Sequence, residues 1–277
     1  MDFTLKSALD YSLAELADIL NKSFVGYIIN IEVDAPQVAQ MTRREAIDLN
    51  LSWVLLKDDE IVGVALVGRR GWTSRLAAMG LATNWRGQGI GRQFLTELIS
   101  QARARGEQTM ILEVIEQNEP ALHLYRSAGF RQLRRLVGYK GKQLKGVTDR
   151  NLHEVDLLEV ARQLIRHGPF DLPWQISGET LAQSSLPMRG YQLGPAYAAI
   201  SDPEQPRLFL RGLVMSEQTQ PHIWGLRLLQ ALIARYPDKS WGIPVLYPEE
   251  LVHGLFEGLG FQQERLTQLQ MIFDLRP

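Results

Sequence analysis

Three glycines at alternate positions, flanked by two arginines, form the part of the sequence whose chemistry is easiest to infer. The segment follows a short apolar stretch and precedes apolar residues at helical spacing, Phe94, Leu95, Leu98 and Ile99. Glycines let a backbone turn tightly with no Cβ in the way of a ligand. Amides at the start of a helix, together with the helix dipole, attract anions. We therefore predict a diphosphate-binding loop made of Arg86, Gly87, Gln88, Gly89, Ile90, Gly91 and Arg92.

The spacing of this loop differs from that of two common phosphate-binding motifs. A Walker A loop needs a lysine followed by Ser or Thr, whereas Arg92 stands near the end of this loop and neither residue follows it. A dinucleotide-binding fingerprint that starts at Gly89 would need a small residue where Phe94 stands. By itself the segment is also compatible with an ordinary tight turn between a strand and a helix.

A second motif follows the loop at a fixed distance along the chain. Met110–Ile115 is apolar and β-branched enough for a buried strand. Asn118 then supplies a helix N-cap, and Pro120 lies in the first turn, where a missing amide costs nothing. Gly129 ends this helix, after Tyr125.

The two motifs in this order resemble the GNAT acetyltransferase superfamily, whose phosphate loop reads Arg/Gln-x-x-Gly-x-Gly/Ala. The resemblance covers roughly residues 1–143 and implies acetyl-CoA as co-substrate, with no metal. It implies that Asn118 contacts coenzyme A and that Tyr125 approaches its sulfur as general acid. It also implies that the strand before the loop splays from its neighbour, so that the backbone of Met79, Gly80 and Leu81 pairs with the pantetheine arm.

The elements expected before the loop agree with that superfamily's order. The patterns predict a strand at Phe3–Leu9, helices at Leu13–Phe24 and Pro36–Leu49, and three strands at Ser52–Leu56, Ile61–Val67 and Arg75–Leu81. We expect an α/β protein of the α+β type, made of two tandem GNAT-like acyl-CoA N-acyltransferase domains. Each would be a mixed, mostly antiparallel sheet flanked by helices.

The second half of the chain resembles the first in sequence pattern, but it lacks the phosphate loop and the tyrosine expected to act as general acid. Gly212-Leu213 is aligned with Gly80-Leu81, and Gly260-Phe261 with Gly129-Phe130. We predict domains at 1–143, which binds acetyl-CoA, and at 148–277, which lacks a phosphate loop. Glu217 and Pro221 stand where the loop would be, and Phe256 stands where Tyr125 would be, so we expect no turnover and no coenzyme A binding there. Its expected role is to stabilise the first domain and to wall the acceptor pocket.

The general base is harder to assign from the sequence. Many members of the superfamily carry a carboxylate on the strand before the loop, but Ser74–Gly80 has none. Glu113 is the best substitute, because a carboxylate in an apolar strand should have a raised pKa. Its spacing to Tyr125 resembles the acid–base pair of ribosomal-protein alanine acetyltransferases. The alternative is a carboxylate paired with an arginine. Lesser candidates are Glu116, Glu32, Asp34 and His123, the last expected on a solvent-facing helix surface.

The acceptor is predicted to be a primary amine of a small molecule or peptide. The segment that lines the acceptor side in the superfamily holds Phe24, Tyr27, Glu32 and Asp34 here, which would suit a cationic amine. Phe24 and Tyr27 are equally compatible with core packing. A non-catalytic acyl-CoA sensor is the second interpretation, since the strand carboxylate is missing.

Composition restricts the partners and the compartment. The chain has 277 residues, 45% of them hydrophobic and 22% charged, and a formal net charge of −1, so nothing favours nucleic acid as a partner. It has 0 cysteines, which excludes disulfides and thiolate chemistry. The first ten residues do not resemble a signal peptide, and no apolar run is long enough to span a membrane. We expect a cytoplasmic monomer or homodimer.

Overall fold

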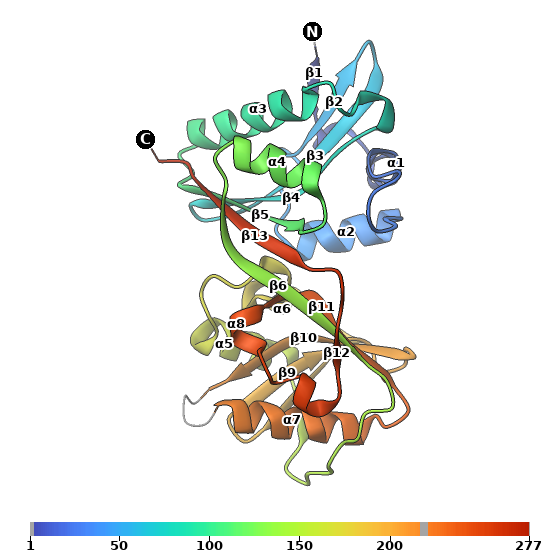
Figure 1. Cartoon of the computed structure of the whole chain (residues 1–277), viewed down its shortest axis with the longest axis vertical. Coiled ribbons are helices and arrows are strands. Elements are labelled where there is room, and N and C mark those ends of the chain that lie inside the picture. The colour runs from blue at the N-terminus through green and yellow to red at the C-terminus, as the bar shows by residue number, and fades with distance from the viewer. Residues whose placement is uncertain (1–2, 217–220, 277) are drawn as a thin grey trace. The chain divides into compact units, whose positions relative to one another are not determined.

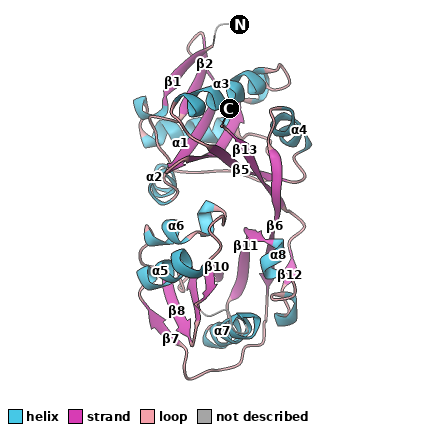
Figure 2. Cartoon of the chain, turned by 90° about the vertical axis from the view of Figure 1, so that its left-hand side faces the viewer, coloured by secondary structure: helices cyan, strands magenta, loops and turns pink. Residues whose placement is uncertain are grey.

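The computed structural model describes residues 3–216 and 221–276. It forms two compact units, the first comprising Met1–Leu133 and Leu269–Pro277 and the second comprising Arg134–Gln268. Each unit is a mixed sheet with helices on both faces, as expected for the α+β class (Figures 1 and 2).

The sheet of the first unit has the strand order β1-β2-β3-β4-β5-β13. Its strands are β1 (Thr4–Ser7), β2 (Trp53–Lys57), β3 (Glu60–Arg70), β4 (Thr73–Leu81), β5 (Thr109–Ile115) and β13 (Gln268–Asp274). Strands β1 to β4 pair antiparallel, and β4 pairs parallel with β5. The helices are α1 (Leu13–Ser23), α2 (Ala35–Arg44), α3 (Ile90–Ala104) and α4 (Glu119–Ser127), with 3-10 turns η1 (Ala8–Asp10) and η2 (Thr83–Trp85).

Alternation along the strands assigns the helices to opposite faces of this sheet. Val54 and Leu56 of β2 pack in one core with α1 and α2, whereas Leu55 packs in the other core with α3 and α4. Successive strand side chains point to opposite faces, so each strand supplies both cores. Ser12 begins α1 and Asp34 begins α2, each as part of a capping box.

Strands β4 and β5 stay together for only a short distance. Their parallel register runs from Thr73 opposite Thr109 to Arg75 opposite Ile111. Beyond it, the β3–β4 pairing passes through an irregularity at Ala77 and continues to Leu81. The strands therefore part at the end that leads into the glycine loop, as the resemblance implied.

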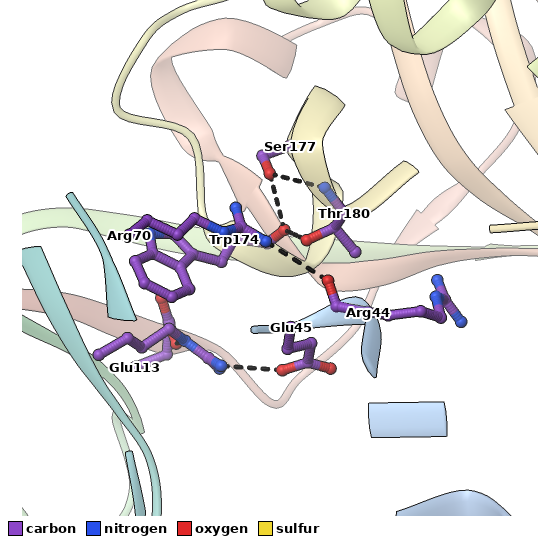
Figure 3. Close-up of polar contacts among 8 residues, drawn as sticks. Arg44, Glu45, Arg70, Glu113, Trp174, Ser177 and Thr180 are labelled. Carbon is purple, nitrogen blue, oxygen red and sulfur yellow. Dashed lines mark hydrogen bonds and ion pairs between the residues drawn. The ribbon is translucent and has the colours of Figure 1, made fainter. Parts of the chain in front are cut away.

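The second unit has the strand order β6-β11-β10-β9-β8-β7, with β12 paired to β6. Its strands are β6 (Arg131–Gly141, within this unit from Arg134), β7 (His153–Val155), β8 (Arg189–Leu193), β9 (Ala196–Ile200), β10 (Arg207–Met215), β11 (Ser240–Pro248) and β12 (Gln262–Gln263). Its helices are α5 (Leu157–His167), α6 (Gly178–Ala182), α7 (Pro221–Arg235) and α8 (Glu249–Val252), with 3-10 turns η3 (Trp174–Ile176) and η4 (Glu257–Leu259). The hydroxyls of Ser177 and Thr180, at the start of α6, both donate to the Trp174 carbonyl (Figure 3).

The compact units differ from the predicted domain boundaries of 1–143 and 148–277 in two segments. Residues 136–141 of β6 pair antiparallel with β11, so they lie in the second unit. Leu269, Met271 and Leu275 are buried in a core of the first unit. The C-terminal strand thus completes the first sheet, beside β5.

Two predicted element boundaries in the first unit were wrong for local backbone reasons. The strand expected to Leu9 ends at Ser7, because residues 8–10 form a 3-10 turn. The helix expected to Leu49 ends at Arg44, where Ala46 follows with a φ of 53°. In the second unit, α8 stops at Val252, before Gly254 with a φ of 77°.

The two units repeat one another with a shift from the predicted alignment. Both β4 and β10 have nine residues, and each carries one irregularity after its short parallel pairing, at Ala77 and at Arg211. On this basis Gly80 is equivalent to Val214 rather than to Gly212. Helices α3 and α7 have fifteen residues each.

Candidate active site

A cleft of about 660 Å³ opens in the first unit where β4 and β5 part. Four segments line it: the turn after α1, the end of β4, the glycine loop and the start of α4. The structure therefore brings the two sequence motifs to a single cleft.

The glycine loop is open toward this cleft. Gly87 and Gly89 have φ values of 73° and 80°, and a Cβ built on either would meet no atom within 4 Å. Gly89 is the N-cap of α3 and provides no side-chain hydrogen bond to it. The first helical hydrogen bonds come from the amides of Arg92 and Gln93, so the amides before them have no partner in the helix. Space, backbone amides and the positive end of α3 suit a bound phosphate.

Arg86 connects two segments at the edge of the cleft by donating hydrogen bonds to backbone carbonyls. Its Nε donates to Leu81 at 2.8 Å, and its Nη2 donates to Ser23 at 3.1 Å and to Val25 at 2.8 Å. These bonds join the turn after α1 to the end of β4. The sequence had suggested only that Arg86 adds charge to the loop. Arg92 also lines the cleft, and its Nη2 donates to Ser127 at 3.2 Å.

Gly80 lies where α1 ends against β4. A Cβ at this position would come within 2.9 Å of both the Phe24 ring and the Ser23 carbonyl. Glycine therefore allows the close approach, and Met79, Gly80 and Leu81 all line the cleft.

Asn118 is the N-cap of α4, Tyr125 lies within this helix, and both line the cleft. The Oδ1 of Asn118 caps α4 by accepting from the Ala121 amide at 3.3 Å. Tyr125 is 8% exposed, and its ring meets Phe130 edge to face at 5.8 Å. Burial, and to a lesser degree Tyr27, raises the pKa of the Tyr125 phenol above its usual 10.0, so the phenol is protonated at neutral pH.

Glu113 lies in a buried ion pair and is not among the residues that line the cleft. Its carboxylate accepts from Arg75 Nε at 2.8 Å, and the two side chains are 3% and 4% exposed. Arg75 also donates to Glu45 at 2.8 Å. The alternative interpretation, a carboxylate paired with an arginine, is the arrangement found. Glu113 as base remains a prediction, without support from this geometry.

The other candidates separate into those at the cleft and those away from it. Phe24 and Tyr27 line it, with ring centroids 5.3 Å apart, whereas Glu32 and Asp34 do not. Asp34 accepts from the Gln37 amide at 2.8 Å to cap α2. The side chain of His123 is exposed as expected, but it also lines the cleft. In the sequence, only the position of His123 two residues before Tyr125 indicated that it lies near the cleft. Among the described residues, those lining the cleft include no carboxylate.

The second unit has different side chains at the equivalent positions. Phe256 is fully buried in its core, and Pro248 precedes α8 without a side-chain cap. Glu217, one of the residues expected to replace the phosphate loop, lies outside the described part of the chain, as does 218–220. Within the described residues, there is no cluster of His, Cys, Asp or Glu able to hold a metal, and no helix combines the length and apolarity of a membrane span.

Sequence comparison relates the segment that forms this cleft to a known family. Residues 13–130 match the acetyltransferase (GNAT) family. The chain is similar to a streptothricin acetyltransferase of Streptomyces lavendulae, with 39% identity over 26% of this chain and 40% of that protein. It is similar to N-alpha-acetyltransferase 30 of Schizosaccharomyces pombe, with 31% identity over 32% of this chain and 62% of that protein. The matched segments thus span less than two thirds of these relatives.

Solved structures resemble both units at once. A tandem GNAT protein from the clavulanic acid biosynthesis pathway has a TM-score of 0.66 and 14% identity, over 100% of this chain and 99% of its own. A GCN5-related N-acetyltransferase from Sphaerobacter thermophilus has a TM-score of 0.68 and 13% identity, over 99% and 96%. Similarity at this identity concerns the fold alone. Residues 13–130 thus match the acetyltransferase (GNAT) family, and both units have the fold of known tandem GNAT proteins.

Proposed function

We propose that the protein is an N-acetyltransferase that moves the acetyl group of acetyl-CoA to a primary amine by direct attack in a ternary complex. The observation that carries this proposal is the position of Tyr125. Its protonated phenol and the open glycine loop line the same cleft. A site that only binds an acyl-CoA has no need of a buried proton donor.

The residues of the cleft fit acetyl-CoA, which would supply an acetyl group activated as a thioester. Gly87 and Gly89 leave room for phosphate oxygens beside the amides that begin α3. Met79 and Leu81 lie on the part of β4 that does not pair with β5. Backbone groups there can pair with an extended ligand. Asn118 keeps its amide nitrogen for a further hydrogen bond, because its cap uses only Oδ1.

Tyr125 acts as the general acid that protonates the departing sulfur. Its raised pKa disfavours the phenolate, so the phenol carries its proton over the whole neutral range. Positioned proton transfer of this kind contributes about 10²–10⁴-fold to a rate.

The acceptor is a small-molecule or peptide amine with a modest pKa. Deprotonating a lysine-like amine with a pKa near 10.4 costs roughly 4–5 kcal/mol at pH 7, whereas an α-amine near 7.8 costs about 1 kcal/mol. A cleft lined by no carboxylate, among the described residues, offers little help with the larger cost. His123 or a water molecule then suffices as base. One relative is named an L-amino acid N-acyltransferase, which agrees with an α-amine acceptor.

Calorimetric titration with acetyl-CoA tests the binding part of the proposal. One site per chain is expected, lost in Gly89→Glu and kept in Gly106→Glu. Gly106 is the matched control, since its φ of 79° and its free surroundings resemble those of Gly89 but it does not line the cleft. A screen of α-amines and alkylamines for release of free thiol then tests turnover. Binding without turnover of any amine would favour the alternative, a non-catalytic acyl-CoA sensor.

A further inference from the structure

The second unit has a cavity of its own, of about 440 Å³, where β10 and β11 part. The two strands pair in parallel only from Arg207 opposite Ser240 to Phe209 opposite Gly242. This repeats the divergence of β4 and β5 in the first unit. The volume lies in the range of small-molecule sites. All of the residues that line the cavity belong to the second unit.

Most of the cavity wall is apolar. Residues of α5, the segment that follows it, η3, β10 and the segment after α8 supply it, among them Leu164, Leu172, Ile176, Leu213, Met215 and Leu255. Apolar surface that is buried against such a wall gains roughly 25 cal/mol per Å². The main body of a ligand in this cavity should therefore be apolar, in contrast to the phosphate-bearing ligand of the first cleft.

One polar group in this wall lacks a partner. Tyr247 is 5% exposed and lines the cavity, and its hydroxyl makes no hydrogen bond to the described residues. Its ring is fixed edge to face against Phe256 at 6.2 Å. Buried hydroxyl groups are nearly always hydrogen-bonded, because an unsatisfied one carries its full desolvation penalty. A ligand oxygen that accepts from Tyr247 would satisfy it.

The charges around Tyr247 favour an anionic oxygen. Burial raises the pKa of this phenol, and the positive charge of Arg211, which does not line the cavity, partly opposes the rise. His167 and His222 also line the cavity. Glu250 lines it with the opposite charge, but its carboxylate is half-exposed and lies 3.5 Å from Arg134.

We propose that the second unit binds a small monocarboxylic acid with an apolar tail. The carboxylate accepts a hydrogen bond from Tyr247, and the tail lies among the apolar side chains of the cavity. This site needs neither a phosphate loop nor a proton donor in the position of Tyr125. It is therefore independent of acetyl transfer, and it gives the second unit a ligand of its own.

Titration of the full chain with octanoate tests the proposal, with excess coenzyme A present to fill the first cleft. One site is expected, and Tyr247→Phe should weaken it about tenfold or more, because a hydrogen bond to a charged group is lost. Tyr197→Phe is the control, since Tyr197 is also buried in this unit but does not line the cavity. Octanamide should bind more weakly than octanoate.

Two further variants locate the site. Leu251 lines the cavity and is 41% exposed, so Leu251→Trp should narrow the cavity and abolish octanoate binding. Leu158→Trp, at a 44% exposed residue that does not line it, should leave binding unchanged. Tyr247→Phe should unfold at the same temperature as the parent or higher, which separates lost binding from misfolding. No octanoate binding, equal affinity in Tyr247→Phe, or equal affinity for octanamide would each overturn the proposal.

Discussion

The guanidinium of Arg75 and the carboxylate of Glu113 form a buried ion pair, with 2.8 Å between Nε and Oε2. The pair joins neighbouring strands, β4 and β5, close to the point where they part. The carboxylate is thus held by an arginine of the neighbouring strand, and it is not among the residues that line the cleft. Its position suggests instead that it fixes where the cleft begins.

This relationship predicts a structural role for Glu113. Removing one partner of a buried pair typically costs about 3–5 kcal/mol, so Glu113→Ala should lower the free energy of unfolding by an amount of that order. The milder Glu113→Gln should lower it less and leave kcat of the folded protein within a few-fold. Urea denaturation and steady-state kinetics on the same samples provide the measurement. A loss of kcat by about 10²-fold or more, at unchanged stability, would instead identify Glu113 as the base.

Tyr125→Phe should lower kcat by about 10²-fold or more while the KM for acetyl-CoA changes little. The variant removes the proton donor and keeps the ring, which packs against Phe130. Its thermal unfolding should resemble that of the parent, which serves as the folding control. An unchanged kcat would show that the thiolate leaves without a proton from this residue.

Gly89→Ala and Gly106→Ala form a matched pair that separates backbone strain from binding. Both residues have φ near 80°, with open space around the position of a Cβ. An alanine in this region costs about 1–2 kcal/mol, so both variants should lose similar stability. Only Gly89→Ala should raise the Kd for acetyl-CoA, because only Gly89 lines the cleft. Equal Kd values for the two variants would argue against the phosphate role of the loop.

Stability should fall at alkaline pH. Burial raises the pKa of both Tyr125 and Tyr247 above the 10.0 of an unfolded tyrosine. The unfolded chain therefore loses these protons first, and stability that is complete below pH 10 declines as the pH rises further. Each such group contributes up to about 1.4 kcal/mol per pH unit. Urea unfolding from pH 9 to 11 should show a shallower decline for the double variant Tyr125→Phe/Tyr247→Phe; parallel curves would contradict this.

The fragment 1–143 should be insoluble or inactive. It lacks Leu269, Met271 and Leu275, whose side chains are at most 3% exposed in a core of the first unit. A fragment in which 1–133 is joined to 268–277 by a flexible Gly/Ser linker restores those residues and should recover acetyl-CoA binding. Full activity in fragment 1–143 would show that the C-terminal strand is dispensable.

The structure brings the two local motifs of the sequence together at one cleft. Glycine loops and N-caps such as Gly89 and Asn118 depend on backbone conformations that few residue types allow, so their types and spacing are informative. We expected β4 and β5 to diverge because the two motifs resemble those of the GNAT superfamily, in which these strands splay apart.

Long-range pairing could not be predicted in the same way. Nothing in Gln268–Asp274 indicates that it pairs beside β5 rather than within the second half, because strand partners depend on register far along the chain. The partner of Glu113 was open for the same reason: Arg75 is separated from it by 38 positions. The predicted alignment of Gly80 with Gly212 differs by two positions from the one that the strand bounds and irregularities indicate, in which Gly80 is equivalent to Val214.

The C-terminal strand also sets the order in which the protein can mature during translation. Residues 269–275 emerge from the ribosome only after the whole second unit, yet they belong to the core of the first. The sheet of the first unit therefore keeps an unpaired edge while more than 130 residues are synthesised. The second unit can fold as soon as its own segment has emerged. The unit with the cleft is thus the last to be finished, although its sequence comes first.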